Sequence, residues 1–321
     1  MNIEFENPLT HQPVTSTPAG LMENGKIVYP LIDGVTRIAS NSNYTESFGF
    51  QWNQFVTTQI DKYNNLDLSK KRFFAETGWD KEVLKGKKIL EVGSGAGRFS
   101  QVVLDFTDAE LYSIDYSNAV DANFKNNGSN PRLHLFQASI YEMPFAKGQF
   151  DKVFCFGVLQ HTPDVRRSIL SLADMVKPGG ELVVDFYPYK NFLTKIQAKY
   201  ILRPFTRKMD HTTLFNKINR NIGWLIKTYK FLSKIGLGKL NRFLPICDIN
   251  GTLPANLSPQ QLRDMCVLDT FDMFSPEYDQ PQKIKDIITW FKMAGLEDVW
   301  GETIKYENFK AAVVKGFKRK L

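Results

Sequence analysis

The sequence has little cysteine and no long apolar run. Its 321 residues include three cysteines, Cys155, Cys247 and Cys266, and no two of them form a CxxC pair. This pattern indicates neither a disulfide framework nor a cysteine-based zinc site, and it favours a reducing, cytoplasmic compartment. No stretch approaches the roughly 18 consecutive apolar residues of a membrane-spanning helix. The acidic, polar start MNIEFENPLT indicates no secretory signal.

Acidic residues are nearly absent from one segment. Between Lys190 and Arg242 there are 13 Lys or Arg and one acid, Asp210, so this segment carries 13 − 1 = +12, against +7 for the whole chain. Apolar residues recur there at helical spacing, which predicts a helical insertion with a basic face. Two interpretations stay open. The face is a solvated cap, or it contacts something anionic, such as a membrane surface, nucleic acid or a phosphorylated substrate or carrier.

The remaining composition is typical of a folded protein, with 43% hydrophobic and 23% charged residues. The length allows one large domain or two modest ones. From residue 87 to 187, short apolar runs alternate with amphipathic stretches. This alternation predicts a parallel sheet with helices on both faces. Before it, residues 1–43 indicate a loop-rich module with one or two weak strands, and residues 44–86 indicate helical packing.

A glycine-rich turn follows the first predicted strand of this sheet. Its glycines fall at 93, 95 and 97, whereas a dinucleotide fingerprint would place its third glycine at the position of Arg98. Glycine allows a tight bend and a close approach of a ligand to the backbone. Glu91, just before the turn, suits a ligand with a cationic amine better than a diphosphate.

Asp115 ends the next predicted strand, 18 residues beyond Gly97. In a doubly wound sheet, an acid at this position can accept both hydroxyls of a ribose. The alternative is an Asp that caps the following helix.

Four segments together resemble the motifs of class I S-adenosylmethionine-dependent methyltransferases: EVGSGAGRF (91–99), SIDYS (113–117), FDKVFCFGVLQHTPD (150–164) and VKPGGELVV (176–184). The resemblance implies S-adenosylmethionine as the cofactor. It implies that the methionyl part is surrounded by Glu91, Gly93, Gly95 and Gly97. Asp115 would hold the ribose, with the adenine between Tyr116, Ser139 and Ile140. The methyl-donor end would be lined by Phe156 and Gly157. The family often has an acid where this chain has Ser139, so the adenine contact lacks that charge.

The resemblance extends to a bacterial subgroup through TESFGFQWNQFVTTQID (45–61), which contains FGFQW, and through LDTFDMFSPEYDQPQ (268–282). That subgroup often begins with a cysteine-bearing zinc ribbon. VYPLIDGVTRI (28–38) resembles the second half of such a module, but no cysteine precedes Cys155. The resemblance therefore implies a degenerate module without metal, because zinc requires about four ligands.

Candidate catalytic residues follow the fourth and fifth strands. His161 lies just past the fourth strand and is the best-placed base, since histidine transfers protons near neutral pH. Alternatively, His161 is a turn residue whose side chain forms a hydrogen bond with the local backbone. Tyr187 and Tyr189 could shape the acceptor site or orient the nucleophile.

Trp52, with Phe48 and Gln51, could close over the cofactor or pack in the core. Arg72 could pair with the cofactor carboxylate or lie on the surface.

The sequence thus predicts an α/β protein with a Rossmann-like, seven-stranded class I methyltransferase sheet whose last strand is antiparallel. The expected regions are a zinc-ribbon-like module without metal, a helical segment over the cofactor site, a cofactor-binding core, a basic helical cap, and the last helix and strands of the sheet (1–43, 44–86, 87–188, 189–285 and 286–321).

The expected function is methyl transfer to a small-molecule acceptor, and nucleic acid is not the expected partner. Three alternatives stay open. The first is different chemistry on the same cofactor that releases methylthioadenosine, by cyclisation or aminocarboxypropyl transfer. The second is an RNA methyltransferase, which the basic insertion favours. The third is a non-catalytic binding protein on this scaffold. A contact of the basic cap with an anionic membrane surface or a carrier also stays open.

Overall fold

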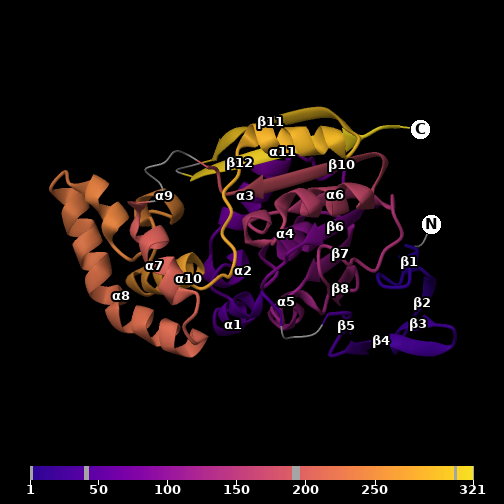
Figure 1. Ribbon diagram of the computed structural model, residues 1–321, viewed down its shortest axis with the longest axis horizontal. Helices are drawn as coiled ribbons and strands as arrows, with labels where there is room; N and C mark the ends of the chain where they lie inside the picture. Colours follow the sequence, from indigo (N-terminus) through magenta and orange to yellow (C-terminus); the bar gives the residue numbers. More distant parts are fainter. Residues whose placement is uncertain (1–2, 40–42, 190–195, 307–308, 321) are drawn as a thin grey trace. The chain divides into compact units, whose positions relative to one another are not determined.

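The computed structural model describes residues 3–39, 43–189, 196–306 and 309–320 (Figure 1). The chain forms two compact units. The first comprises Met1–Pro188, Tyr278–Tyr306 and Lys310–Leu321, and the second comprises Tyr189–Glu277 and Glu307–Phe309. The predicted basic cap ran to residue 285, but the structure ends the helical unit at Glu277. The reason is that the following segment bonds the first unit: the Gln280 N–H donates to the Gln160 carbonyl at 2.8 Å and Gln282 to Tyr187 at 2.9 Å.

The core of the first unit is a sheet with the strand order β8-β7-β6-β9-β10-β12-β11. Pairing is parallel from β8 through to β10, and β12 is antiparallel to β10. This order confirms the predicted fold class with its antiparallel last strand. The strands are β6 (Lys88–Val92), β7 (Glu110–Asp115), β8 (Leu133–Gln137), β9 (Phe150–Cys155), β10 (Val176–Phe186), β11 (Leu296–Tyr306) and β12 (Phe309–Lys318).

The N-terminal module adds five short strands to this sheet, next to β8 (Figure 1). β5 pairs in parallel with β8, with Val35 opposite Leu135. The sequence predicted only one or two strands here, because each is two to seven residues long and most of β4 is exposed, so no apolar alternation marks them. Their bounds are β1 (Phe5–Glu6), β2 (Pro13–Thr17), β3 (Gly20–Glu23), β4 (Lys26–Ile32) and β5 (Val35–Arg37).

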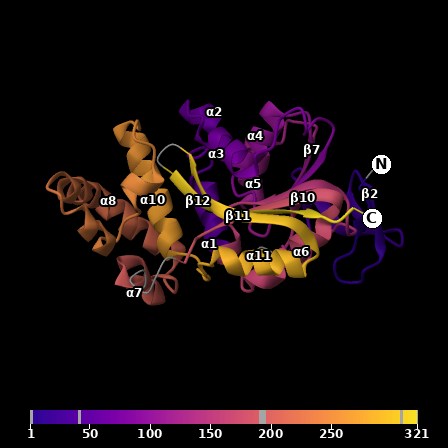
Figure 2. The same cartoon turned by 90° about the horizontal axis from the view of Figure 1, so that it is seen from above.

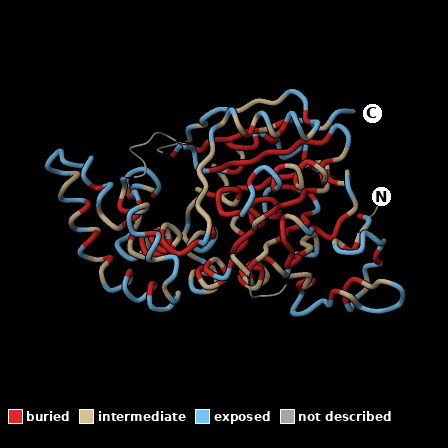
Figure 3. Tube along the Cα trace, in the orientation of Figure 1, coloured by how far each residue is buried: buried red, intermediate tan, exposed pale blue. Residues whose placement is uncertain are grey.

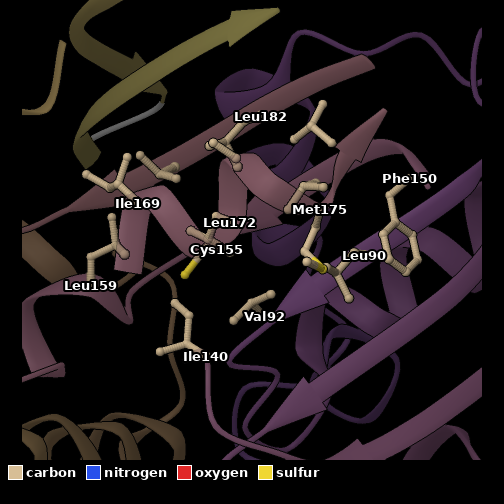
Figure 4. Close-up of a cluster of buried hydrophobic side chains, with 14 of the residues drawn as sticks. Leu90, Val92, Ile140, Phe150, Cys155, Leu159, Ile169, Leu172, Met175 and Leu182 are labelled. Atoms are coloured by element: carbon tan, nitrogen blue, oxygen red, sulfur yellow. The ribbon is translucent and has the colours of Figure 1, made fainter. Parts of the chain in front are cut away.

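Helices cover both faces of the core sheet, as Figure 2 shows. One face packs against α6 (Val165–Met175) and α11 (Ile284–Met293), and the other packs against α3 (Leu68–Thr77), α4 (Arg98–Phe106) and α5 (Val120–Asn127). Figure 4 shows Leu90 and Val92 of β6 facing the α6 side. Two further helices precede α3, namely α1 (Glu46–Gln54) and α2 (Asp61–Asn64), and a short 3-10 turn, η1 (Leu159–His161), follows β9.

The regular elements of the second unit between residues 196 and 277 are all helices. Its longest helix, α8, begins after Asp210, whose side chain accepts from the Thr213 N–H at 2.8 Å. α10 begins with a capping box between Ser258 and Gln261. Along α8, buried and exposed positions alternate (Figure 3). No described helix is both long and apolar enough to cross a membrane. The elements are α7 (Ala198–Thr206), α8 (His211–Lys234), η3 (Gly238–Phe243), α9 (Ile249–Thr252) and α10 (Pro259–Phe274).

Candidate functional site

The glycine turn joins β6 to α4 and needs glycine for two reasons. Gly93, Gly95 and Gly97 all have positive φ, at 84°, 53° and 84°, a region that disfavours residues with a Cβ. Space is also short. A Cβ on Gly93 would lie 2.2 Å from the Val158 side chain, and one on Gly97 would lie 2.1 Å from the Asn123 amide oxygen. Glycine at these positions therefore lets neighbouring side chains pack directly against the backbone of the turn.

Asp115 ties the end of β7 to this turn. Its Oδ2 accepts from the Gly95 N–H at 2.8 Å, and its Oδ1 accepts from the backbone N–H and the hydroxyl of Ser117 at 2.8 and 2.7 Å. Burial raises the pKa of Asp115, although these hydrogen bonds oppose the shift. A carboxylate accepts about four hydrogen bonds. These three donors thus leave one acceptor position, on the oxygen that faces Gly95.

Helix α1 packs against three of the turns that follow parallel strands. The Trp52 indole nitrogen lies 2.9 Å from where a Cβ on Gly95 would be. The Asn53 amide donates to the Asn118 carbonyl after β7 at 3.0 Å. The Phe48 ring lies 4.9 Å from the His161 ring after β9. The segment predicted to close over the cofactor therefore lies at the carboxyl ends of β6, β7 and β9, where ligands bind in sheets of this type.

Several buried polar atoms near this edge have no hydrogen-bond partner among the described residues, including Glu91 Oε1, Ser94 Oγ and Gln51 Oε1. The other Glu91 oxygen accepts from the hydroxyls of Ser100 and Ser113. Burial raises the pKa of Glu91 to about 7. An unpaired buried polar group costs about 1–3 kcal/mol. These atoms would be stabilised by a ligand that brings an amine and other polar groups.

Arg72 and Asp185 connect α3 to the ends of β9 and β10. The Arg72 guanidinium pairs with Glu76 at 2.9 Å and with Asp185, and Asp185 also accepts from the Gly157 N–H. Glu76 is fully buried, and burial raises its pKa although Arg72 opposes the shift. Arg72 is thus part of an interior ion-pair network and not a surface residue. No heavy atom other than chain neighbours lies within 4 Å of a Cβ built on Gly157, so a ligand could approach the backbone there.

The predicted adenine residues follow β7 and β8. The Tyr116 ring lies 5.2 Å from the Tyr44 ring, and its carbonyl accepts from the Asn43 amide at 3.1 Å. Ser139 is 5% exposed, and its hydroxyl accepts from the Tyr141 N–H at 3.2 Å. Ile140 and Phe156 are buried in the hydrophobic clusters on opposite faces of the sheet.

His161 sits in an aromatic environment. Its Nδ1 lies 3.0 Å from the Tyr278 carbonyl. A carbonyl can only accept, so Nδ1 carries a proton and Nε2 is the basic nitrogen of the neutral ring. The Tyr187 ring packs edge-on at 5.6 Å from the His161 ring. The structure thus brings together His161, Tyr187 and Phe48.

Tyr189 belongs to the second unit, and its role stays a prediction. The motif LDTFDMFSPEYDQPQ is divided between the units, because Asp269, Asp272 and Ser275 lie in the second unit and Tyr278 in the first. No group of three or more His, Cys, Asp or Glu side chains able to hold a metal occurs in the described residues, those of the N-terminal module included.

Sequence reasoning missed Asp185, Glu76 and Tyr44. Asp185 carried a readable signal, because it is an acid near the end of an apolar strand, ELVVDFY, as Asp115 is in ELYSID. Glu76 and Tyr44 carried none, since their partners lie in other elements.

Residues 90–184 match a family model described as a methyltransferase domain. The matched stretch runs from β6 into β10 and contains the glycine turn, Asp115 and His161. The match supports a methyltransferase domain over this part of the chain, and the strand order agrees with the predicted Rossmann-like α/β sheet.

Curated relatives match over part of their length. The chain is similar to a ubiquinone biosynthesis O-methyltransferase of Coxiella burnetii, with 34% identity over 123 residues, 37% of this chain and 52% of that protein. It is also similar to the O-methyltransferase rstn1 of Aspergillus nomiae, with 23% identity over 39% of this chain and 57% of that protein. A third relative is a tRNA U34 carboxymethyltransferase of Campylobacter curvus, with 28% identity over 32% of this chain and 35% of that protein. The chain thus spans about half the length, or less, of these relatives.

A solved structure that resembles this chain is the magnesium protoporphyrin IX methyltransferase of Synechocystis PCC 6803, determined with bound SAH. It has 15% sequence identity, covers 86% of this chain and 96% of that one, and has a TM-score of 0.45.

Proposed function

We propose that this chain is an S-adenosylmethionine-dependent methyltransferase whose acceptor is a small molecule. The observation that supports this best is the hydrogen bond that joins the glycine turn after β6 to Asp115 at the end of β7. There the glycine turn brings the Gly95 N–H onto Asp115, and the carboxylate keeps one acceptor position. A ribose hydroxyl can donate to that position, and the glycines at 93, 95 and 97 let the rest of the cofactor approach the backbone of the turn closely.

The residues at this edge fit the cofactor. The buried, unpartnered oxygens of Glu91 and Ser94 suit its ammonium group. Tyr116, Ser139 and Ile140 would border the adenine, and Trp52 would cover the turn at Gly95. Near Phe156 and Gly157 the backbone is open to a ligand. Because the Arg72 guanidinium already pairs with two carboxylates, in this proposal it positions Gly157 through Asp185.

When bound, S-adenosylmethionine supplies a methyl group on a positively charged sulfur, which an acceptor nucleophile displaces in line. His161 takes the acceptor's proton at Nε2 where the nucleophile must lose one, since its Nδ1 proton is held by the Tyr278 carbonyl. Tyr187 packs against the His161 ring and restricts its orientation. Tyr189 keeps the role that the sequence predicts for it, which is to shape the acceptor site or to orient the nucleophile.

The acceptor is proposed to be small because a curated relative with 34% identity over the matched stretch is named for ubiquinone biosynthesis. The alternatives differ in product. The carboxymethyltransferase relative is named for a tRNA and for a group other than methyl. RNA methylation and non-methyl chemistry on the same cofactor therefore belong in the same experiment.

The test is mass spectrometry of the purified full chain with S-adenosylmethionine, alone, with a small-metabolite extract of the host, and with host RNA. The proposal expects S-adenosylhomocysteine with the extract and one metabolite heavier by a methyl group. Methylthioadenosine, or a modified RNA in place of a modified metabolite, would overturn it. No cofactor binding by calorimetry would indicate a non-catalytic scaffold.

A His161→Ala variant tests the proton-transfer role in the same assay. Loss of a positioned base lowers turnover by roughly 10²–10⁴-fold, whereas cofactor affinity should be unchanged. The control is His134→Ala. His134 lies in β8, and its ring stacks on the Tyr112 ring of β7. Full activity of His161→Ala would return His161 to a structural role.

A further inference from the structure

Helix α8 is buried on one side only. Leu214, Ile218, Ile222, Leu225 and Tyr229 are buried at intervals of three and four residues. This spacing places them on one side of the helix, and α8 packs against α10 within the second unit. The packing within the second unit therefore uses this side of α8.

The opposite side of α8 nevertheless carries a second ordered pattern, called here the basic–aromatic face. Its members recur at intervals of three, four, three, four and three residues, so they form one straight stripe. The stripe spans 18 residues, or about 25 Å of helix at 1.5 Å per residue. They are Lys217, Arg220, Trp224, Lys227, Phe231 and Lys234.

Both aromatic side chains of this face are exposed, Trp224 by 52% and Phe231 by 61%. The Trp224 indole N–H donates to Asn221 on the same helix at 2.9 Å, so its polar atom is satisfied locally. Large exposed apolar side chains in a continuous patch mark a contact surface. Four more exposed apolar side chains follow the helix in sequence, Ile235, Leu237, Leu240 and Phe243, which are 45–51% exposed.

The cations of the basic–aromatic face have no carboxylate partner among the described residues, and α8 itself contains no Asp or Glu. The face therefore presents uncompensated positive charge along the same stripe as the two rings. A partner that matches it must supply negative charge and an apolar layer together.

An anionic lipid surface supplies both. Lysine and arginine bind lipid phosphates, and aromatic rings enter the boundary between headgroups and acyl chains. A straight stripe suits a flat surface. A nucleic-acid duplex would pair with the cations through its phosphates and leave Trp224 and Phe231 in water. We propose that the basic–aromatic face of α8 lies on the headgroup layer of an anionic membrane, with both rings inserted. This inference does not depend on the proposed function.

The test is co-sedimentation of the full chain with vesicles of phosphatidylcholine alone and of phosphatidylcholine mixed with phosphatidylglycerol. We expect binding to the anionic vesicles only, and weaker binding as salt increases. Equal binding to both vesicle types, or no binding, would overturn the proposal.

Two variants separate the two parts of the contact. Each cation near an anionic surface contributes about 1 kcal/mol, so Lys217→Gln/Arg220→Gln/Lys227→Gln should weaken binding on the order of a hundredfold. Trp224→Ala/Phe231→Ala leaves the charge unchanged and should weaken binding by roughly tenfold or more. Unchanged binding of either variant contradicts the proposal.

Matched controls come from the first unit. Lys81→Gln/Lys85→Gln/Lys125→Gln removes the same charge from exposed positions, and Leu9→Ala/Val83→Ala removes exposed apolar side chains. Both should bind like the parent chain, and losses equal to those of the α8 variants would contradict the proposal. Circular dichroism checks that each variant is folded. If the chain binds RNA, ignores anionic vesicles, and loses RNA binding in the α8 variants, the occupant is a nucleic acid and the proposal is wrong.

Discussion

The two units of the chain place their charged side chains in opposite environments. In the first unit, Arg72 lies between Glu76 and Asp185, which are 0% and 4% exposed. In the second unit, the cations of α8 are exposed and have no carboxylate partner among the described residues.

The difference follows from the free-energy cost of placing a charge in each environment. A buried charge is stable only in a geometry that pairs it, because leaving it unpaired costs several kcal/mol. An exposed Lys or Arg stays hydrated and can move. Buried charges therefore suit an edge that must hold one ligand in one position, whereas exposed charges suit a surface that contacts many similar groups without fixed geometry.

The largest expected effect comes from removing Arg72, whose side chain is 21% exposed and lies between the two buried carboxylates. Arg72→Met leaves Glu76 and Asp185 as buried carboxylates that share no counter-charge, so it should lower the free energy of unfolding by about 3–5 kcal/mol. Arg220→Met on the exposed face of α8 is the matched control and should change it by less than about 0.5 kcal/mol. Urea unfolding measures both. Similar changes in the free energy of unfolding for the two variants would contradict this contrast between the units.

The next effect concerns ligand affinity. Asp115→Asn keeps the shape of the side chain but removes the charge that accepts from Gly95 and Ser117 and would accept from a ribose. A hydrogen bond to a charged group contributes about 1.5–3 kcal/mol, so cofactor affinity by calorimetry should fall on the order of 10- to 100-fold. Asp264→Asn, at a partly buried position of α10 in the second unit, should leave affinity unchanged. Unchanged affinity of a folded Asp115→Asn variant would contradict the ribose assignment.

Much of the first unit was predictable because its buried parallel strands appear as short, mostly apolar runs that alternate with amphipathic stretches. KILEV and FDKVFC, for example, correspond to β6 and β9, and the glycines at 93, 95 and 97, which predicted a tight bend, have positive φ. The N-terminal strands were not predictable in number, because they are short and largely exposed.

The partners of the site residues could not be predicted. Arg72 and Asp185 are 113 residues apart in sequence, and His161 and Tyr278 are 117 apart. Each pair meets only because the sheet and its covering segments bring distant parts of the chain together. A single sequence shows which residue types are present but not which of them become neighbours, so the tautomer of His161 and the interior position of Arg72 required the structure.

A third prediction uses the buried carboxyl of Glu91. Burial raises its pKa to about 7 from an ordinary 4.5, so between these values the folded state holds a proton that the unfolded state has lost. Its contribution to stability is therefore complete below pH 4.5 and disappears as pH rises through 7, by at most about 1.4 kcal/mol per pH unit. Glu91→Gln should flatten this slope and raise stability at pH 8, and it should weaken cofactor binding. Glu302→Gln, at an exposed position, should keep the slope. A slope unchanged by Glu91→Gln would mean that this carboxyl is already ionised in the folded protein.

The smallest effect tests whether the two units are separate in stability as well as in composition. Ser258 caps α10 in the second unit, and Asp164 caps α6 in the first, where it accepts from the Arg167 N–H at 2.9 Å. Replacing either cap by alanine should cost about 1 kcal/mol. If each unit opens on its own, hydrogen exchange will speed up in α10 alone for Ser258→Ala and around α6 alone for Asp164→Ala. Faster exchange in both units for either variant would mean that the chain unfolds as one cooperative body, and the contrast between the units would then be one of surface chemistry only.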